Sequence, residues 1–457
     1  MKLPIPKSLL LGALFLFLGC AGSREETAFK EIAEIERQVY SGAVDVQPDS
    51  LLPVLNENAS LETYLAYAAL NNPQLKAAFN NWKAALAQVP QARALPDPRF
   101  NYSYYIREVE TRVGPQRQAF GISQQFPWFG KLQLKGDVAL ESANAARQRY
   151  EAAKLQLFYQ VKSAYYEYCY LDRAILVVNE NIQLIKSLEA VILAKYRAGT
   201  TPYSDLVQVQ VEIDKLQDQQ KSLTDLIRPV KARLNAVMNR PLNMPLSPAV
   251  KLAADSVNIS DERLSEFLKD NNPALKESDF LAEREKDAIG LAKKSYYPDI
   301  MLGVDYIDTG EALSPATPES GKDPLIARLS LNLPIWFGKN RASVKQAEAR
   351  YLSAIQRRQN KENQLLLNLE TTLYQFREAQ RKIRLYQDIL LPRAREALNV
   401  AQSAFRVDNI GYLDLINAQR TLLEFELTLE RSLANHAQRL AEIEMLVGRE
   451  LPKKNEK

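Results

Sequence analysis

The sequence predicts a mainly α-helical protein with a small β part, in which a duplicated set of long helices forms an α-barrel tunnel beside four β-strands per chain. The first observation is a stretch without proline between Pro127 and Pro202, where apolar residues recur at three and four steps. A helix of roughly 68 residues would reach about 100 Å, longer than a compact domain holds. The second is a duplication, because Trp-Phe-Gly-Lys occurs at 128–131 and again at 336–339. The third is two segments in which apolar and polar residues alternate with the period of a strand.

The N-terminus has the features of an export signal. Two lysines precede an apolar run over residues 9–18, which is too short to span a bilayer and ends at Gly19-Cys20. This pattern predicts a signal peptide over 1–19. The small residue before Cys20 resembles a bacterial lipobox, and this resemblance implies lipid attachment at Cys20 and a lipidated segment over 20–59. The alternative is an ordinary signal peptide followed by an incidental cysteine.

The composition argues against an enzyme, a metal protein or a nucleic-acid binder. The formal net charge of +4 is too small to favour nucleic acid. His436 lies on an apolar helix face and Cys169 stands among tyrosines, so both side chains are expected to be packed rather than bound to a metal. No phosphate loop or nucleophile motif occurs in the sequence. We therefore predict no catalytic residue, no metal site and no cofactor.

The helical parts fall into two repeats. Asn-Asn-Pro occurs at 71–73 and 271–273 and should interrupt a helix each time, since proline lacks the backbone donor. Ser60 is the expected N-cap of the first repeat. Pro392 should kink only the second long helix. The predicted organisation is repeat one over 60–240, an equatorial linker over 241–260, repeat two over 261–451 and a polar tail over 452–457. The expected helices are 60–95, 131–198, 204–238, 261–296, 340–407 and 412–447.

Each repeat also carries a predicted hairpin, over 99–126 and 299–334. No later apolar run approaches the ~20 residues of a membrane helix, so a membrane would have to be crossed by strands. Four strands cannot close a membrane barrel, whose smallest forms have about eight, and an open edge is costly in lipid. Two copies would give eight strands and a filled interior, whereas three would give twelve and an aqueous passage, and we expect the trimer. The residues predicted to face lipid are Phe100, Tyr102, Tyr104, Leu302, Val304, Leu329 and Leu331.

The duplicated plan resembles the TolC family of outer-membrane efflux channels from about Ser60 to Leu451. The resemblance rests on the Asn-Asn-Pro helices, the paired hairpins and the Tyr-x-Asp-Leu segments at 203–206 and 412–415. The segment 124–131 is most similar to the cation-efflux (CzcC-type) branch. The resemblance implies a homotrimer with a twelve-stranded β-barrel in outer-membrane lipid and a helical tunnel in the periplasm. It also implies a periplasmic adaptor protein and an inner-membrane RND-type pump as partners.

The same resemblance implies a gate near the ends of the long helices. Asp205 and Asp414 match the carboxylates of the family's constriction, and Tyr196 and Phe405 match its gate-holding aromatic residues. Two positions depart from the family: Asn417 replaces a second acidic ring and Ile410 replaces a gate-locking arginine, so the sequence leaves open how the closed gate is held. The alternative role of each aspartate is to N-cap the helix that follows the turn. The turn residues expected to contact the adaptor are Arg197, Gly199, Arg406 and Gly411.

The predicted function is a passive outer-membrane channel of a tripartite efflux pump, with metal cations or small toxic compounds as candidate cargo. The predicted location is the bacterial outer membrane, with a lipid anchor and a periplasmic tunnel. One alternative with the same architecture is the outer channel of a type I protein-secretion system. Another is a periplasmic coiled-coil scaffold or adaptor, which the lipid-facing aromatic residues argue against. The sequence does not name the exported compound.

Overall fold

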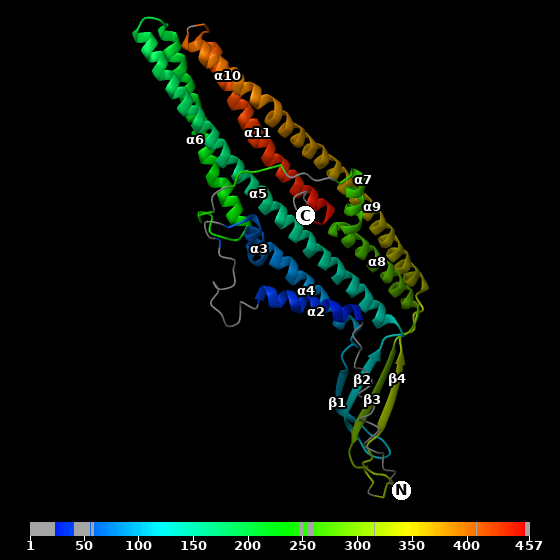
Figure 1. Cartoon of the computed structure of the whole chain (residues 1–457). Helices are drawn as coiled ribbons and strands as arrows, with labels where there is room; N and C mark the ends of the chain where they lie inside the picture. Colours follow the sequence, from blue (N-terminus) through cyan, green and yellow to red (C-terminus); the bar gives the residue numbers. More distant parts are fainter. Residues whose placement is uncertain are drawn as a thin grey trace. The chain divides into compact units, whose positions relative to one another are not determined.

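The computed structural model describes residues 23–40, 55, 59–246, 250–254, 259–314, 316–407 and 409–452, so Cys20 lies outside the described residues. The described chain is mainly helical with one four-stranded sheet, which confirms the predicted fold class (Figure 1). It forms two compact units. The first holds the sheet and the helical segments within 80–147 and 277–358, together with the N-terminal helix, and the second holds the described segments within 42–79, 148–276 and 359–457. Among the described residues no helix is both long and apolar enough to cross a membrane.

The helices follow the predicted ranges closely. The 67 residues of α5 form one continuous helix, whereas its counterpart is interrupted by a π-helical turn directly before Pro392. Proline has no N–H for the regular i to i−4 bond, which accounts for an interruption in the second long helix alone. The helices are α2 (Ser23–Tyr40), α3 (Leu61–Asn71), α4 (Pro73–Arg93), α5 (Lys131–Arg197), α6 (Tyr203–Val237), α7 (Asp261–Asn271), α8 (Pro273–Lys293), η1 (Lys294–Tyr296), α9 (Phe337–Leu385), η2 (Tyr386–Leu390), α10 (Leu391–Arg406) and α11 (Tyr412–Val447).

In the second unit each Asn-Asn-Pro motif joins two helices. Asn72 accepts a hydrogen bond from the Leu75 N–H at 3.0 Å and its amide donates to the Val237 carbonyl at 2.8 Å. Asn272 repeats this arrangement, and its amide donates to the Leu446 carbonyl at 2.8 Å. Asn72 therefore caps α4 and binds the C-terminal end of α6. Asn272 does the same for α8 and α11.

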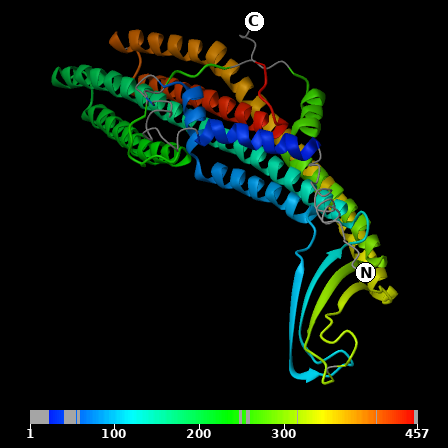
Figure 2. The ribbon, with the colours of Figure 1, turned by 90° about the horizontal axis from the view of Figure 1, so that it is seen from below.

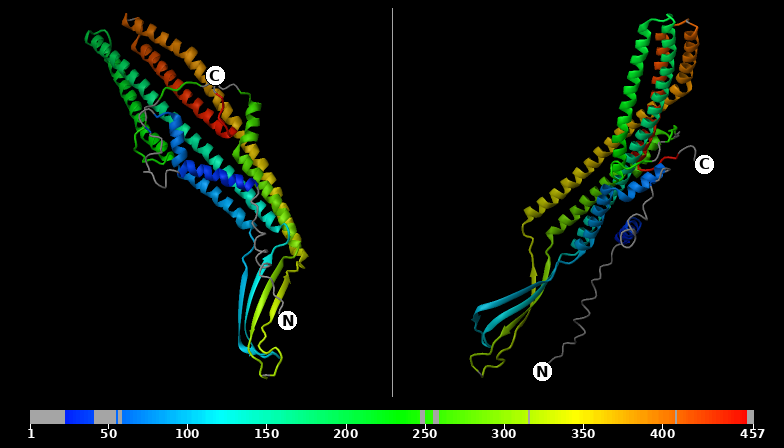
Figure 3. Two further views of the ribbon diagram at one scale, coloured as in Figure 1. Left: turned by 60° about the horizontal axis from the view of Figure 1, so that its bottom comes forward. Right: turned by 90° about the vertical axis from the view of Figure 1, so that its left-hand side faces the viewer.

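The core of the second unit has three parts. One cluster belongs to repeat one together with linker residues, a second belongs to repeat two, and a third combines α5, α6, α10 and α11. These four helices run side by side to the two turns (Figure 3). Of these three clusters of described residues, the third alone combines residues of both repeats. Representative buried members are Tyr64, Leu157 and Leu234 in the first cluster, Leu268, Leu369 and Leu440 in the second, and Ile185, Ile213, Phe405 and Leu415 in the third.

In the first unit four antiparallel strands lie in the order β1 (Arg99–Val109), β2 (Gln116–Phe126), β3 (Ile300–Thr309) and β4 (Leu325–Leu331). The sheet consists of the two predicted hairpins joined by pairing between β2 and β3. The loops of the hairpins also touch, since the Gly310 N–H donates to the Pro115 carbonyl at 2.7 Å. Gly114, with φ +132°, allows this approach, because a Cβ there would lie 1.8 Å from the Gly310 oxygen.

Helix α2 covers α4 and the start of α5 in the same unit (Figure 2). Its Glu25, Glu31 and Glu36 form ion pairs with Arg93, Arg147 and Lys83 respectively. Its Ile32 is buried, as is Trp82 of α4. Repeat two has no copy of this helix among the described residues, and the α8 residue that corresponds to Trp82 is the smaller Ala282.

Candidate functional site

The two turns at the ends of the long helices place both predicted gate aspartates in the first turn of a returning helix. Pro202 is the N-cap of α6 and Gly411 is the N-cap of α11, and neither makes a side-chain capping bond. The alternative that Asp205 and Asp414 are N-caps is therefore wrong, because both lie at the third helical position. A carboxylate there still interacts favourably with the N-terminal end of the helix dipole.

The environments of the two aspartates differ. Asp205 is partly buried and accepts hydrogen bonds from the Thr201 hydroxyl at 3.0 Å and the Ser204 hydroxyl at 3.4 Å. Asp414 is exposed, as is Asn417 one helical turn later. The predicted contact residues of the turns are also exposed: Arg197, Gly199, Arg406 and Gly411. Gly199, with φ +73°, ends α5 in the left-handed conformation.

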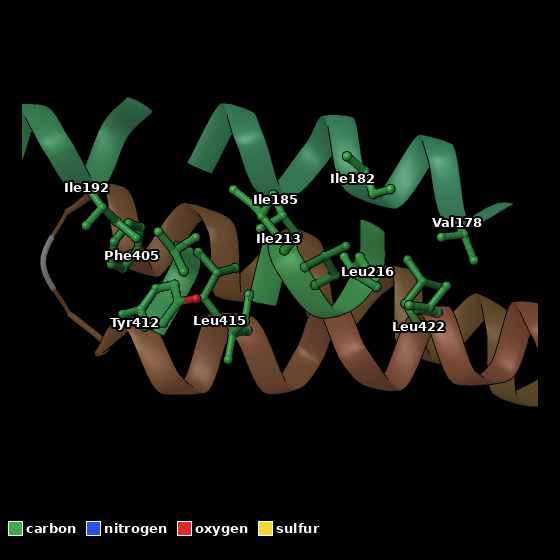
Figure 4. Close-up of a cluster of buried hydrophobic side chains, with 14 of the residues drawn as sticks. Val178, Ile182, Ile185, Ile192, Ile213, Leu216, Phe405, Tyr412, Leu415 and Leu422 are labelled. Carbon is green, nitrogen blue, oxygen red and sulfur yellow. The ribbon is translucent and has the colours of Figure 1, made fainter. Parts of the chain in front are cut away.

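The aromatic residues of the two turns occupy opposite environments. Tyr196 is 41% exposed and packs on Tyr203, with 5.5 Å between the ring centroids. The matching Phe405 is buried beneath Lys195, whose Nζ lies 4.4 Å from the ring centroid and donates to the Phe405 carbonyl at 2.9 Å. Tyr412, which matches Tyr203, is only 3% exposed (Figure 4). Its burial raises the pKa of the phenol to about 12.

An ion pair that the sequence analysis missed ties the two repeats together beyond the turns. Arg420 of α11 donates from Nε to Glu212 Oε1 of α6 at 3.0 Å, and a second guanidinium N–H reaches the other carboxylate oxygen. Glu212 is only 7% exposed, and the hydrogen bond from Arg420 lowers the pKa of its carboxyl against the opposing effect of burial. The sequence feature that could have indicated this ion pair is the position of Glu212 on the apolar face of its helix, between Val209 and Ile213.

The seven residues predicted to face lipid are all exposed, from 45% for Val304 to 69% for Phe100. They share alternate positions of the strands, and Tyr102 packs across the strand pair on Phe120 with 5.2 Å between ring centroids. The intervening positions carry polar groups, including an ion pair of 2.8 Å between Arg328 and Asp305. The sheet therefore has one apolar and one polar face.

The bend between β2 and α5 in repeat one is held by residues of repeat two that lie directly before β3. Asp299 accepts from the Trp128 N–H at 2.9 Å and from Lys131 Nζ at 2.7 Å, while the Trp128 ring stacks on Tyr297 at 5.4 Å. The Lys131 side chain is only 13% exposed. The corresponding bend between β4 and α9 in repeat two is exposed, since Trp336 is 71% exposed.

The remaining chemically notable side chains are packed as expected. His436 is 1% exposed, and its ring stacks on Phe376 with 4.4 Å between centroids. Cys169 is fully buried, and burial raises the pKa of its thiol to about 11. Within the described residues, no group of three or more His, Cys, Asp and Glu side chains is placed to hold a metal ion.

Comparisons with known proteins agree with this architecture. The chain is 20% identical to the cobalt-zinc-cadmium resistance protein CzcC of Cupriavidus metallidurans over 404 residues, covering 88% of this chain and 93% of that protein. Among solved structures, CusC matches with a TM-score of 0.72 and 18% identity over 89% of this chain and 99% of its own. VceC of Vibrio cholerae, an outer membrane protein, matches with a TM-score of 0.71 and 18% identity over 86% of this chain and 97% of its own.

The family itself follows from a match to both repeats. The model of the outer membrane efflux protein family matches residues 65–240 and 264–449. The similarity to CzcC agrees with the branch that the segment 124–131 resembles. Since the match extends over more than half of the sequence, the chain belongs to the outer membrane efflux protein family.

Proposed function

We propose that three copies of this chain form a passive outer-membrane conduit of a tripartite efflux pump. The observation that carries the proposal is a sheet of four strands with an exposed apolar face and two edge strands, β1 and β4, each of which pairs on one side only among the described residues. Unpaired backbone groups in lipid cost several kcal/mol each, so the sheet needs further strands to close. Three copies supply twelve strands, enough for an aqueous lumen.

The turn residues are proposed to form the periplasmic end of this conduit. Asp205 and Asp414 would line the constriction with Asn417, and Tyr196 and Phe405 would hold the adjoining helices. Six carboxylates around one axis attract cations and repel each other, which favours a gate that responds to bound cations. The turns themselves, which include Arg197, Gly199, Arg406 and Gly411, are the proposed contact for a periplasmic adaptor. An inner-membrane RND-type pump would supply the energy.

Cargo and anchoring belong to the same proposal. Similarity to a cobalt-zinc-cadmium resistance protein favours metal cations as cargo, with small toxic compounds as the alternative. Cys20 is proposed to carry the lipid anchor, and the two repeats are proposed to extend over 60–240 and 261–451. Export of proteins through a type I system would use the same conduit. Genes for an ABC exporter beside this one would favour that system over a proton-driven pump.

The test is the mass of the detergent-extracted particle after the detergent contribution is subtracted, together with its conductance in a planar bilayer. We expect a trimer that conducts ions. A monomer or dimer that still conducts would overturn the proposal. Labelled fatty acid should be incorporated at Cys20, and a Cys20→Ala protein that keeps the label would disprove attachment there.

A further inference from the structure

A small cleft lies within the second unit where α5 of repeat one meets α10 and α11 of repeat two. Its volume is about 150 Å³, and its lining includes four buried apolar side chains: Ile185, Leu398, Phe405 and Leu415. Three of them, Ile185, Phe405 and Leu415, come from three different helices (Figure 4). Val191 also lines the cleft and is 43% exposed, so it belongs to the mouth. An apolar cavity of about this volume accepts benzene, so the cleft has room for one small aromatic ring.

One buried polar side chain in this lining has an unused acceptor. Gln419 is 5% exposed, and its Nε2 donates to Asn181 Oδ1. Its Oε1 is buried and has no hydrogen-bond partner within the part of the chain that the structure describes. A buried acceptor without a donor destabilises the fold. The last torsion of a glutamine side chain has a broad minimum, so a donor in the cleft can reach this oxygen by rotation of the amide.

The corresponding glutamine of repeat one has different surroundings. Gln210, which lies 209 positions before Gln419, is exposed and donates to Glu189 Oε1 at 3.1 Å. The residue that corresponds to Glu189 in repeat two is Leu398, a member of the cleft lining. Repeat two therefore has an apolar wall where repeat one has a charged partner for the glutamine. The cleft and its acceptor are specific to the side of repeat two.

We propose that this cleft binds a small aromatic molecule that carries one hydrogen-bond donor, such as a phenol. The ring packs against Phe405 and the neighbouring aliphatic side chains, and the hydroxyl donates to Gln419 Oε1. The exposed Ser187 and Arg406 and the half-buried Gln402 also belong to the lining. Because the walls come from both repeats, the bound molecule favours the arrangement in which α5 stays packed on α10 and α11. The site lies within one chain and does not depend on the proposed conduit.

A comparison of two probes tests the role of the acceptor. Fluorine NMR titration of the detergent-extracted protein should show saturable binding of 4-fluorophenol. Gln419→Met keeps the length of the side chain and removes the acceptor, so the affinity for 4-fluorophenol relative to 4-fluorotoluene should fall roughly three- to tenfold. This ratio is the readout because the lost hydrogen bond to Asn181 affects both probes alike. Gln210→Met is the matched control and should leave the ratio unchanged.

A second pair of variants tests the location of the site. Val191→Trp places a large ring at the mouth and should abolish saturable binding of both probes, and this variant also measures the amount of probe that the detergent holds. Val211→Trp is the matched control, since Val211 of α6 is 46% exposed and lies outside the cleft lining. Binding that survives Val191→Trp, a ratio that Gln419→Met leaves unchanged, or the absence of saturable binding would each overturn the proposed site. The mass of the particle, which tests the trimer, is independent of all three results.

Discussion

The turns of the two repeats have corresponding sequences and opposite surroundings. On α6, Tyr203 and Val207 are 59% and 38% exposed, whereas the corresponding Tyr412 and Ile416 of α11 are 3% and 1% exposed. The reason is positional, because repeat one covers this face of repeat two within the chain and no described residue covers the same face of repeat one. The exposure of a side chain in this duplicated chain therefore depends on what covers its repeat, in addition to the apolar pattern of its own helix.

The largest difference in stability between the two turns should appear when the corresponding tyrosines, Tyr203 and Tyr412, are replaced by alanine. Tyr412→Ala removes a buried ring and should lower the free energy of unfolding by about 3–5 kcal/mol. Tyr203→Ala removes an exposed ring and should change the stability of the single chain by less than about 0.5 kcal/mol. Denaturant unfolding followed by circular dichroism would measure both.

Tyr412→Phe is the control for the hydroxyl. The Tyr412 hydroxyl is buried and has no hydrogen-bond partner within the described part of the chain, so its removal should be nearly neutral or slightly stabilising. Equal losses for Tyr412→Ala and Tyr203→Ala would show that the two turns are not distinguished by burial.

A smaller effect on stability is expected from the ion pair between Arg420 of α11 and Glu212 of α6. Thr421 of repeat two corresponds to Glu212, and Val211 of repeat one corresponds to Arg420. These two residues cannot form an ion pair. Arg420→Gln leaves Glu212 buried without its charged donor and should cost about 1–3 kcal/mol at pH 7, less than a fully buried pair because Arg420 is half exposed. The matched variant Val211→Gln should cost little.

The pH dependence of this loss follows from the lowered pKa of Glu212. A carboxyl whose pKa is lower in the folded state stabilises that state above its unfolded value, about 4.3, and the stabilisation disappears as the pH falls through the folded value. The difference in the free energy of unfolding between the natural protein and Arg420→Gln should therefore be largest near neutral pH and shrink below about pH 4. A gap that widens in acid would contradict the assigned pairing.

The two aspartates should contribute less to stability than the buried tyrosine or the ion pair. Asp205→Asn combined with Asp414→Asn removes charges that interact with helix dipoles, at about 0.3–1 kcal/mol each. Planar-bilayer recordings should nevertheless show reduced cation selectivity and weaker block by divalent cations. Loss of the trimer with unchanged ion preference would assign these residues to the fold, and the constriction would have to be sought elsewhere.

Local signals were sufficient for the helices and strands. The absence of proline predicted α5 over 131–198, and the helix ends at Arg197. The strand β4 was expected to reach the end of the hairpin at 334 but ends at Leu331, since pairing there depends on a neighbouring strand rather than on alternation. The pair of Glu212 and Arg420 joins residues 208 positions apart, which no local pattern specifies. The gate and adaptor roles stay predictions, because they depend on an assembly of several chains.

The contacts of Asn72 and Asn272 also allow each repeat to close separately during folding. Asn72 closes a loop of 165 positions onto Val237, and Asn272 closes one of 174 positions onto Leu446, so each closure is completed inside its own repeat. Loop-closure entropy grows only slowly with length, and domains made early in synthesis fold first. Repeat one can thus close its joint before repeat two exists, and the later event is the docking of two preformed halves at their shared core. A permuted chain that begins at the linker should consequently still close both joints.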